Sequence, residues 1–328
     1  MKEKILMTSA TGKTGYPTTV QLLKDGYPVK IYVRSRNKKA LELEQLGAEI
    51  AIGELDNFHQ LKAALSDVKR AYYCYPFAPN LLKNTKLFIQ VAKECNLGVT
   101  VFMGQWLSEF DDQKSIHTRE TREAYTEFAN SGLNVIYCIP GYFAESTIFV
   151  LEFAVQLGLM LAPLGNGKNP APSNEDLGLV VAALLKNPEP YIGQKLRPTG
   201  PVSLSPKEMA AVFAKVANRK VRYINIPMWM YKKAAFAQAK EFGLDAFIIS
   251  QSMYYKREYQ KNKFDVGGPT DVVRRVTGKD PDDYETIVRR YLNNSPYKKR
   301  SFSNWFSSMK KFMLLPFTST PSIKGAKV

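Results

Sequence analysis

Apolar and polar positions alternate regularly between Lys4 and Ile139. Short apolar runs are separated by segments whose apolar residues recur every three or four positions, the spacing of one helix face. Because parallel strands need a crossover connection, this alternation predicts an α/β fold with a doubly wound parallel sheet of Rossmann type. The predicted strands are Lys4–Met7, Val29–Val33, Glu49–Ile52, Arg70–Tyr73, Val99–Met103 and Leu133–Ile139. The predicted helices between them are Tyr16–Leu23, Lys38–Leu46, Phe58–Leu65, Leu81–Cys95 and His117–Asn130.

From Tyr142 onward the alternation fades and helical spacing dominates. The pattern predicts a Rossmann domain at residues 1–141 and a smaller, mainly helical lobe at 142–294, some segments of which pack back on the first domain. A tail follows at 295–328. The predicted elements of the lobe are helices at Glu145–Gly158, Asn174–Leu185, Ser205–Asn218, Met228–Phe242 and Ala246–Lys263, and a strand at Val221–Ile226.

The turn after the first strand, Ser9-Ala10-Thr11-Gly12-Lys13-Thr14-Gly15, has the composition of a phosphate-binding turn. A helix that begins directly after a strand presents unpaired N–H groups and the positive end of its dipole to a ligand. Gly12 and Gly15 are small enough to let a pyrophosphate approach the backbone. The glycine pattern is incomplete, because Ser9 or Ala10 stands where a first glycine is usual.

The turn has two alternative interpretations besides dinucleotide binding. Gly12-Lys13-Thr14 resembles the end of the phosphate-binding loop of nucleotide hydrolases. That loop needs a glycine where Met7 stands inside the strand, so the sequence disfavours this class. A glycine-containing connector without a ligand stays open as the second alternative.

The end of the second strand indicates which dinucleotide fits. NAD requires an acidic residue about 20 positions after the turn to bind the ribose 2′-hydroxyl. Here the strand runs into basic residues, with no acid before Glu42, and these charges favour the 2′-phosphate of NADPH. A solvated basic loop is the alternative. The basic residues are Arg34, Arg36, Lys38 and Lys39.

Composition narrows the class of protein further. The 328 residues are 45% hydrophobic and 23% charged, as in a globular protein, with three cysteines and two histidines. None of these has metal-ligand spacing, so no metal site is predicted. Cysteines inside apolar runs and the lack of a secretory signal or spanning segment predict a cytoplasmic protein.

The net charge of +16 is concentrated toward the tail, which has seven basic residues and no acids from Ser295 onward. An amphipathic basic helix is predicted there, with apolar residues at Phe302, Trp305, Phe306, Met309, Phe312 and Met313. Such a helix can dock on the protein's own surface or lie against a membrane surface. Nucleic-acid binding is not predicted, because no recognition motif is present. The tail's basic residues are Lys298, Lys299, Arg300, Lys310, Lys311, Lys324 and Lys327.

Several short pieces, in order and spacing, carry a resemblance to a known family. They are S-A-T-G-x-x-G, V-R-S-R, G-E-L-D-N, V-F-M-G, S-G-L-N-V and P-G-Y-F-A-E, followed by residues 171–176 and 198–201. Together they resemble the NmrA-like family of atypical short-chain dehydrogenases over residues 3–294. The resemblance implies an NADPH-dependent oxidoreductase that reduces a small apolar, quinone-like or carbonyl substrate by hydride transfer. The alternative is a non-catalytic NAD(P)-sensing regulatory protein of NmrA type.

The resemblance also implies roles for individual residues. Arg34, with Lys39 in the same basic stretch, would meet the adenosine 2′-phosphate, and Asp56 would lie by the adenine, although Asp56 or Asn57 could instead cap the next helix. Tyr75 and Pro76, and Gly104 and Gln105, would lie by the nicotinamide. The family usually has a serine pair where Gly104-Gln105 stands. The residues implied to hold the pyrophosphate are Ser9, Thr11, Gly12, Lys13, Thr14 and Gly15.

The proton donor of ordinary short-chain dehydrogenases is missing. They carry a Tyr-x-x-x-Lys pair on the helix after the fifth strand, whereas here Tyr125 is followed four positions later by Ala129. His117 is one candidate donor, because imidazole titrates near neutral pH. Tyr142, after the sixth strand, is the other. Alternatives stay open: His117 can be a surface residue at a helix start, and Tyr142 can serve only in packing. Hydride transfer can also proceed without a proton donor from the protein.

Overall fold

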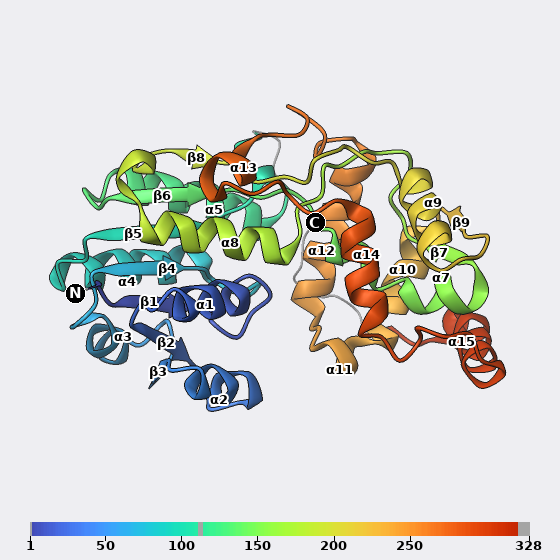
Figure 1. The fold of residues 1–328 in the computed structure, drawn as a ribbon, viewed down its shortest axis with the longest axis horizontal. Coiled ribbons are helices and arrows are strands. Elements are labelled where there is room, and N and C mark those ends of the chain that lie inside the picture. Colours follow the sequence, from blue (N-terminus) through green and yellow to red (C-terminus); the bar gives the residue numbers. More distant parts are fainter. Residues whose placement is uncertain (1, 111–113, 321–328) are drawn as a thin grey trace. The chain divides into compact units, whose positions relative to one another are not determined.

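The structure is a computed structural model that describes residues 2–110 and 114–320. The chain forms two compact units (Figure 1). Unit 1 comprises Met1–Pro140, Asn174–Pro198 and Asp271–Asp280. Unit 2 comprises Gly141–Ser173, Thr199–Thr270 and Pro281–Val328.

Unit 1 is built on a parallel sheet. Within the described residues the sheet has seven strands in the order β3-β2-β1-β4-β5-β6-β8, and every recorded strand pair is parallel. The predicted doubly wound Rossmann fold is therefore confirmed, with β8 as a strand that the apolar pattern did not predict. The strands are β1 (Ile5–Thr8), β2 (Val29–Val33), β3 (Glu49–Ile52), β4 (Arg70–Tyr73), β5 (Val99–Met103), β6 (Val135–Cys138) and β8 (Lys195–Leu196).

Helices cover both faces of this sheet (Figure 1). On one face α1 packs on α8 so closely that a Cβ at Gly178 would lie 2.8 Å from the Pro17 side chain. On the other face α4 and α5 bury a stack of rings that includes Tyr73, Phe88 and Phe128. The elements of unit 1 between the strands are α1 (Gly15–Lys24), α2 (Lys38–Gln45), α3 (Phe58–Leu65), α4 (Leu81–Glu94), η1 (Trp106–Glu109), α5 (Ile116–Ala129), α8 (Asn174–Lys186), η2 (Glu189–Tyr191) and α13 (Val272–Thr277).

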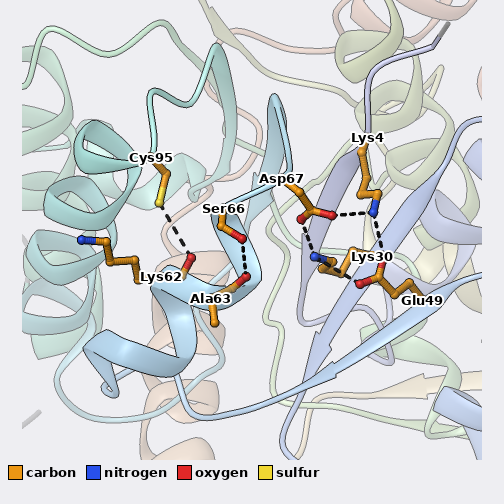
Figure 2. Close-up of polar contacts among 8 residues, drawn as sticks. All are labelled: Lys4, Lys30, Glu49, Lys62, Ala63, Ser66, Asp67 and Cys95. Carbon is orange, nitrogen blue, oxygen red and sulfur yellow. Dashed lines mark hydrogen bonds and ion pairs between the residues drawn. The ribbon is translucent and has the colours of Figure 1, made fainter.

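A charge network closes the amino-terminal edge of the sheet (Figure 2). Lys4 Nζ lies 2.9 Å from Glu49 Oε2 and 2.5 Å from Asp67 Oδ2. Lys30 Nζ lies 3.2 Å from Glu49 Oε1 and also pairs with Asp67. Because the two lysines and two carboxylates alternate, each charge faces opposite charges, and β1, β2, β3 and the segment before β4 are held together. Since ligands of such sheets bind at the opposite edge, we assign this network to stability.

Unit 2 is mainly helical and contains a parallel two-stranded sheet of β7 and β9. The helices predicted at Glu145–Gly158 and Met228–Phe242 are each wrong as single helices. The first is interrupted at Phe149 and Val150, and the second at Gln238. The backbone leaves helical ψ values at Val150, with a ψ of 1°, and at Gln238, with a ψ of 4°. The elements are α6 (Glu145–Ile148), α7 (Leu151–Leu157), β7 (Leu159–Leu161), α9 (Pro206–Val216), β9 (Arg222–Ile224), α10 (Met228–Ala237), α11 (Ala239–Phe242), α12 (Ala246–Gln260), α14 (Tyr284–Asn293), α15 (Phe302–Leu314) and η3 (Leu315–Phe317).

The predicted tail helix is confirmed as α15, and it docks on the rest of unit 2 through polar contacts and through Phe312, which packs on the cluster of Phe153, Leu161 and Ile226. Ser308 is fully buried and donates a hydrogen bond to Glu152 Oε1 at 2.8 Å, and Lys311 Nζ lies 2.9 Å from Glu152 Oε2. Phe302 and Phe306 face outward and are 80% and 60% exposed. The helix therefore presents apolar side chains to the solvent. Residues 321–328, which include the tail residues Lys324 and Lys327, lie outside the described residues.

Candidate functional site

The glycine turn of unit 1 lies where the strand order reverses. β2 and β3 lie on one side of β1, and β4 and the later strands lie on the other. Open α/β sheets bind ligands at the carboxyl ends of strands at such a switch point. Ser9 Oγ, after β1, donates a hydrogen bond to the Cys74 carbonyl, after β4, at 2.7 Å. The Cys74 N–H in turn donates to Thr8 Oγ1 at 2.9 Å, so the two strand ends are tied together.

The turn itself depends on backbone conformations that the sequence pattern only partly reveals. Ser9 has a φ of 50°, a left-handed conformation in which glycine is the usual residue. Its carbonyl accepts a hydrogen bond from the Gly12 N–H at 2.9 Å. A Cβ on Gly15 would lie 2.2 Å from the same carbonyl oxygen, so only glycine fits there. Ser9 thus occupies the first glycine position with the conformation that a glycine would have.

A basic side of the site is formed by the end of β2 and the start of α2. Arg34 is exposed and makes no hydrogen bond or ion pair with any described residue, whereas Arg36 pairs with Glu44 at 2.5 Å. Lys39 Nζ lies 3.4 Å from the Thr11 carbonyl oxygen, which brings this cation to the glycine turn. Of the two arginines, Arg34 and Arg36, Arg34 is therefore the one whose guanidinium is available to a ligand.

The structure shows which of the two predicted residues after β3 caps the next helix. Asn57, not Asp56, caps α3, with its Oδ1 accepting from the Gln60 N–H at 3.1 Å. Asp56 is exposed and pairs with no described residue. Its carboxylate is thus not needed for helix capping.

The loops after β4 and β5 are held by their own hydrogen bonds. Tyr75 donates to the Pro79 carbonyl at 2.8 Å, which orders the exposed Pro76 segment. After β5, Gln105 is buried and donates to Thr121 Oγ1 at 2.8 Å. Both loops leave the same carboxyl edge of the sheet.

Tyr125 has a structural role that sequence reasoning missed. Its hydroxyl accepts hydrogen bonds from the Gln105 N–H at 3.0 Å and Ser108 Oγ at 2.9 Å. A Cβ on Gly104 would lie 2.1 Å from this hydroxyl. Gly104 therefore makes room for Tyr125, and Tyr125 clamps the loop after β5. Desolvation on burial raises the pKa of Tyr125 well above its ordinary value, which does not suit a proton donor.

The sequence suggested that His117 titrates near neutral pH, but burial in the structure lowers its pKa. It is buried at the start of α5 and stacks on Phe77 with ring centroids 4.3 Å apart. Burial lowers the pKa of His117 to about 4, and a hydrogen bond to the Ala78 backbone offsets only part of this. The imidazole is therefore neutral at pH 7.

Tyr142 lies in unit 2 beside a lysine that no sequence pattern connects with it. Lys256 Nζ, on α12, donates a hydrogen bond to Tyr142 Oη at 2.9 Å. The two residues are 114 positions apart, and no spacing rule links them. Tyr142 also packs edge-on against Tyr259.

The described residues contain neither a metal-binding cluster nor a membrane-spanning helix. No group of three His, Cys, Asp or Glu side chains there is arranged to hold a metal ion. In the same parts of the chain no helix has the length and apolar character needed to span a bilayer.

The strand order, the glycine turn at the switch point and the basic side next to it define a Rossmann protein of the dinucleotide-binding class. The chain belongs to the NmrA-like family, whose model matches residues 1–138 and 147–274. The predicted family is thereby confirmed. The tail lies beyond the matched residues.

Similar proteins include reductases and a regulator. An NAD(P)H azoreductase of Xenophilus azovorans is 29% identical over 276 residues, which are 84% of this chain and 93% of that protein. An NADPH-dependent quinone oxidoreductase of Escherichia coli, solved with NADPH, has a TM-score of 0.73 at 19% identity, covering 88% of this chain and all of that one. NmrA, a negative transcriptional regulator solved with NADP, has a TM-score of 0.70 at 17% identity, covering 91% and 99%.

Proposed function

We propose that this protein is an NADPH-dependent oxidoreductase that transfers hydride to a small apolar, quinone-like or carbonyl substrate. The observation that carries the proposal is the Arg34 guanidinium, which pairs with none of the described residues and lies on the basic side of a glycine turn at the switch point. A free cation there matches the 2′-phosphate that distinguishes NADPH from NADH. The azoreductase relative supports the same chemistry.

The described residues fit the dinucleotide. The turn has no room for a side chain at Gly15, as close approach of a pyrophosphate requires. We propose that Arg34 and Lys39 meet the 2′-phosphate and that Asp56 lies by the adenine. When bound, NADPH supplies the hydride. The residues proposed for the pyrophosphate are Ser9, Thr11, Gly12, Lys13, Thr14 and Gly15, and those for the nicotinamide end are Tyr75, Pro76, Gly104 and Gln105.

We also propose that Tyr142 and His117 take part at the reacting end. Because its pKa is about 4, His117 acts in this proposal as a neutral imidazole beside Phe77 and not as a titrating acid. Tyr142 is then the proposed proton donor.

A non-catalytic dinucleotide sensor is the second candidate function. It is favoured by the engagement of Tyr125 in the loop after β5, with Ala129 where ordinary dehydrogenases have lysine. The fold of the NADP-bound regulator NmrA is consistent with it.

Cofactor titration followed by acceptor turnover separates these functions. We expect NADPH to bind more tightly than NADH, and nicotinamide absorbance to fall when quinones, azo compounds or aldehydes are added. Binding of both redox forms without turnover would favour the sensor. If neither dinucleotide bound, the proposal would be wrong.

We further propose a cytoplasmic location with α15 against a membrane surface. Free cysteines support the location, and the exposed rings of Phe302 and Phe306 on α15 support the contact. Lys298, Lys299 and Arg300, just before the helix, are exposed and form no ion pair with described residues, so they are available to anionic lipid headgroups.

Sedimentation with vesicles tests the membrane contact. We expect binding to vesicles with about a third phosphatidylglycerol and little binding to pure phosphatidylcholine. Replacing both Phe302 and Phe306 by serine should reduce the bound fraction about fivefold or more, because the inserted apolar surface is lost. Trp229→Ser, at a 55% exposed position of α10, is the matched control and should leave binding unchanged. Equal binding to both kinds of vesicle would contradict the electrostatic part of the proposal.

A further inference from the structure

Lys256 is a buried lysine without a carboxylate partner in the described parts of the chain. It is only 6% exposed. Its Nζ lies 2.9 Å from Tyr142 Oη and 3.2 Å from Ser252 Oγ, and 4.2 Å from the centroid of the Tyr231 ring. The nearby Glu258, on the same helix, is instead paired with Lys261 and Lys263. The ammonium is therefore surrounded by hydroxyls and aromatic rings.

A buried ammonium without a counter-ion is expensive, and such groups often mark functional sites. Here the rings of Tyr231 and Tyr142 and the hydroxyl oxygens stabilise the cation. Burial lowers the pKa of Lys256, but Tyr142 and Tyr231 raise it by more, so the lysine is charged at neutral pH. The cluster keeps a positive charge next to a phenol.

The direction of the hydrogen bond leaves the Tyr142 proton available. A charged lysine has only donors, so Tyr142 Oη is the acceptor in this contact. The Tyr142 O–H itself donates to no described residue. A buried donor without an acceptor calls for a partner, and a substrate atom that becomes negative would supply one.

We propose that Lys256 positions and activates Tyr142 as the proton donor of the reduction, an inference that rests on the proposed reductase function. When bound, NADPH would supply hydride to one atom of a C=O or N=N group of the substrate, and the electron pair of that double bond would move to the other atom. The Tyr142 O–H bond then breaks, and its proton forms a new O–H or N–H bond on the substrate. The Lys256 ammonium stabilises the phenolate until it regains a proton from water.

Tyr231 and Ser252 give the returning proton a path. Tyr231 Oη and Ser252 Oγ are 2.5 Å apart, and Ser252 also contacts Lys256. Burial raises the pKa of Tyr231, but the charge of Lys256 and the hydrogen bonds from Ser252 and Lys256 lower it by more. Both groups are partly exposed, so the path reaches the surface of unit 2 from the buried lysine.

Two kinds of acceptor isolate the proton-transfer step. An aldehyde or azo compound needs a proton after hydride transfer, whereas a cationic triarylmethane dye becomes neutral by hydride alone. In the full-length protein, Tyr142→Phe and Lys256→Met should each lower kcat with the proton-requiring acceptor about 100-fold. The same variants should keep kcat with the dye within about threefold of wild type. Fluorescence titration without acceptor should also give a Kd for NADPH within about threefold of wild type.

Two further variants separate activation from structural support. Lys256→Arg keeps the charge and should restore part of the lost activity. Lys263→Met removes a partly buried lysine that is paired with a carboxylate, and it should leave the ratio between acceptors unchanged.

Equal losses with both acceptors, or no loss, would overturn the role of Lys256. A wild-type protein that reduces the dye but no proton-requiring acceptor would overturn this inference and leave the reductase function standing. A wild-type protein that binds NADPH but reduces neither acceptor would overturn both.

Discussion

Gly15→Ala should weaken NADPH binding about 100-fold or more and lower the melting temperature. The added Cβ would lie 2.2 Å from the Ser9 carbonyl oxygen and 3.0 Å from the Ala10 Cα, and both of these are backbone atoms. The turn would have to open, because backbone cannot rotate away as a side chain can. Opening the turn also displaces the Ser9 carbonyl, which accepts a hydrogen bond from the Gly12 N–H. The backbone N–H groups proposed to bind the pyrophosphate would move as well. Fluorescence titration with NADPH and thermal unfolding would measure the two effects.

Gly12→Ala is the matched control for this prediction. Its Cβ would lie 3.0 Å from the same oxygen, a contact that a shift of a few tenths of an ångström relieves. We therefore expect a smaller loss of affinity than for Gly15→Ala. Full affinity in Gly15→Ala would refute the assignment of this turn to the pyrophosphate.

Arg34→Asp should reverse the cofactor preference. A charge-assisted hydrogen bond contributes about 1.5 to 3 kcal/mol, and each 1.4 kcal/mol is about tenfold in affinity. Losing the guanidinium and adding a carboxylate should therefore weaken NADPH binding about 100-fold. NADH, which has no 2′-phosphate, should bind as well as before or better, since an acid at this place can accept from the ribose hydroxyl. Parallel titrations with the two dinucleotides measure the change.

Arg36→Asp controls for the loss of a positive charge in the same segment. Arg36 is already paired with Glu44, so we expect a change in NADPH affinity of about threefold or less. Equal losses of NADPH and NADH affinity in Arg34→Asp would argue against a contact with the 2′-phosphate.

The fold of unit 1 was largely predictable because its signals are local. The bounds of β3, β4 and β5 agree with the prediction, since each is a short apolar run enclosed by turn residues. β8 escaped prediction because Lys195 and Leu196 are too short a run to show periodicity. The helix predicted at Asn174–Leu185 exists as α8, but only the structure shows that it packs on α1.

The candidate site was predictable in part. Its glycine turn and basic residues are contiguous in the sequence, and their meaning follows from where they fall between strand and helix. The choice of Asn57 over Asp56 as cap needed coordinates, because both residue types cap helices. The burial of His117 was also invisible, since the Phe77 that covers it comes from another loop.

By itself, the sequence determined the alternating strands and helices, the glycine turn and the basic residues beside it, because each depends on neighbours a few positions apart. Only the tertiary structure decided that Tyr125 clamps the loop after β5 and that α15 turns Phe302 and Phe306 outward. It alone brought Lys256 to Tyr142 across 114 positions. The physical reason is that burial, pKa and hydrogen bonding depend on the atoms that surround a side chain, and folding draws those atoms from distant parts of the chain.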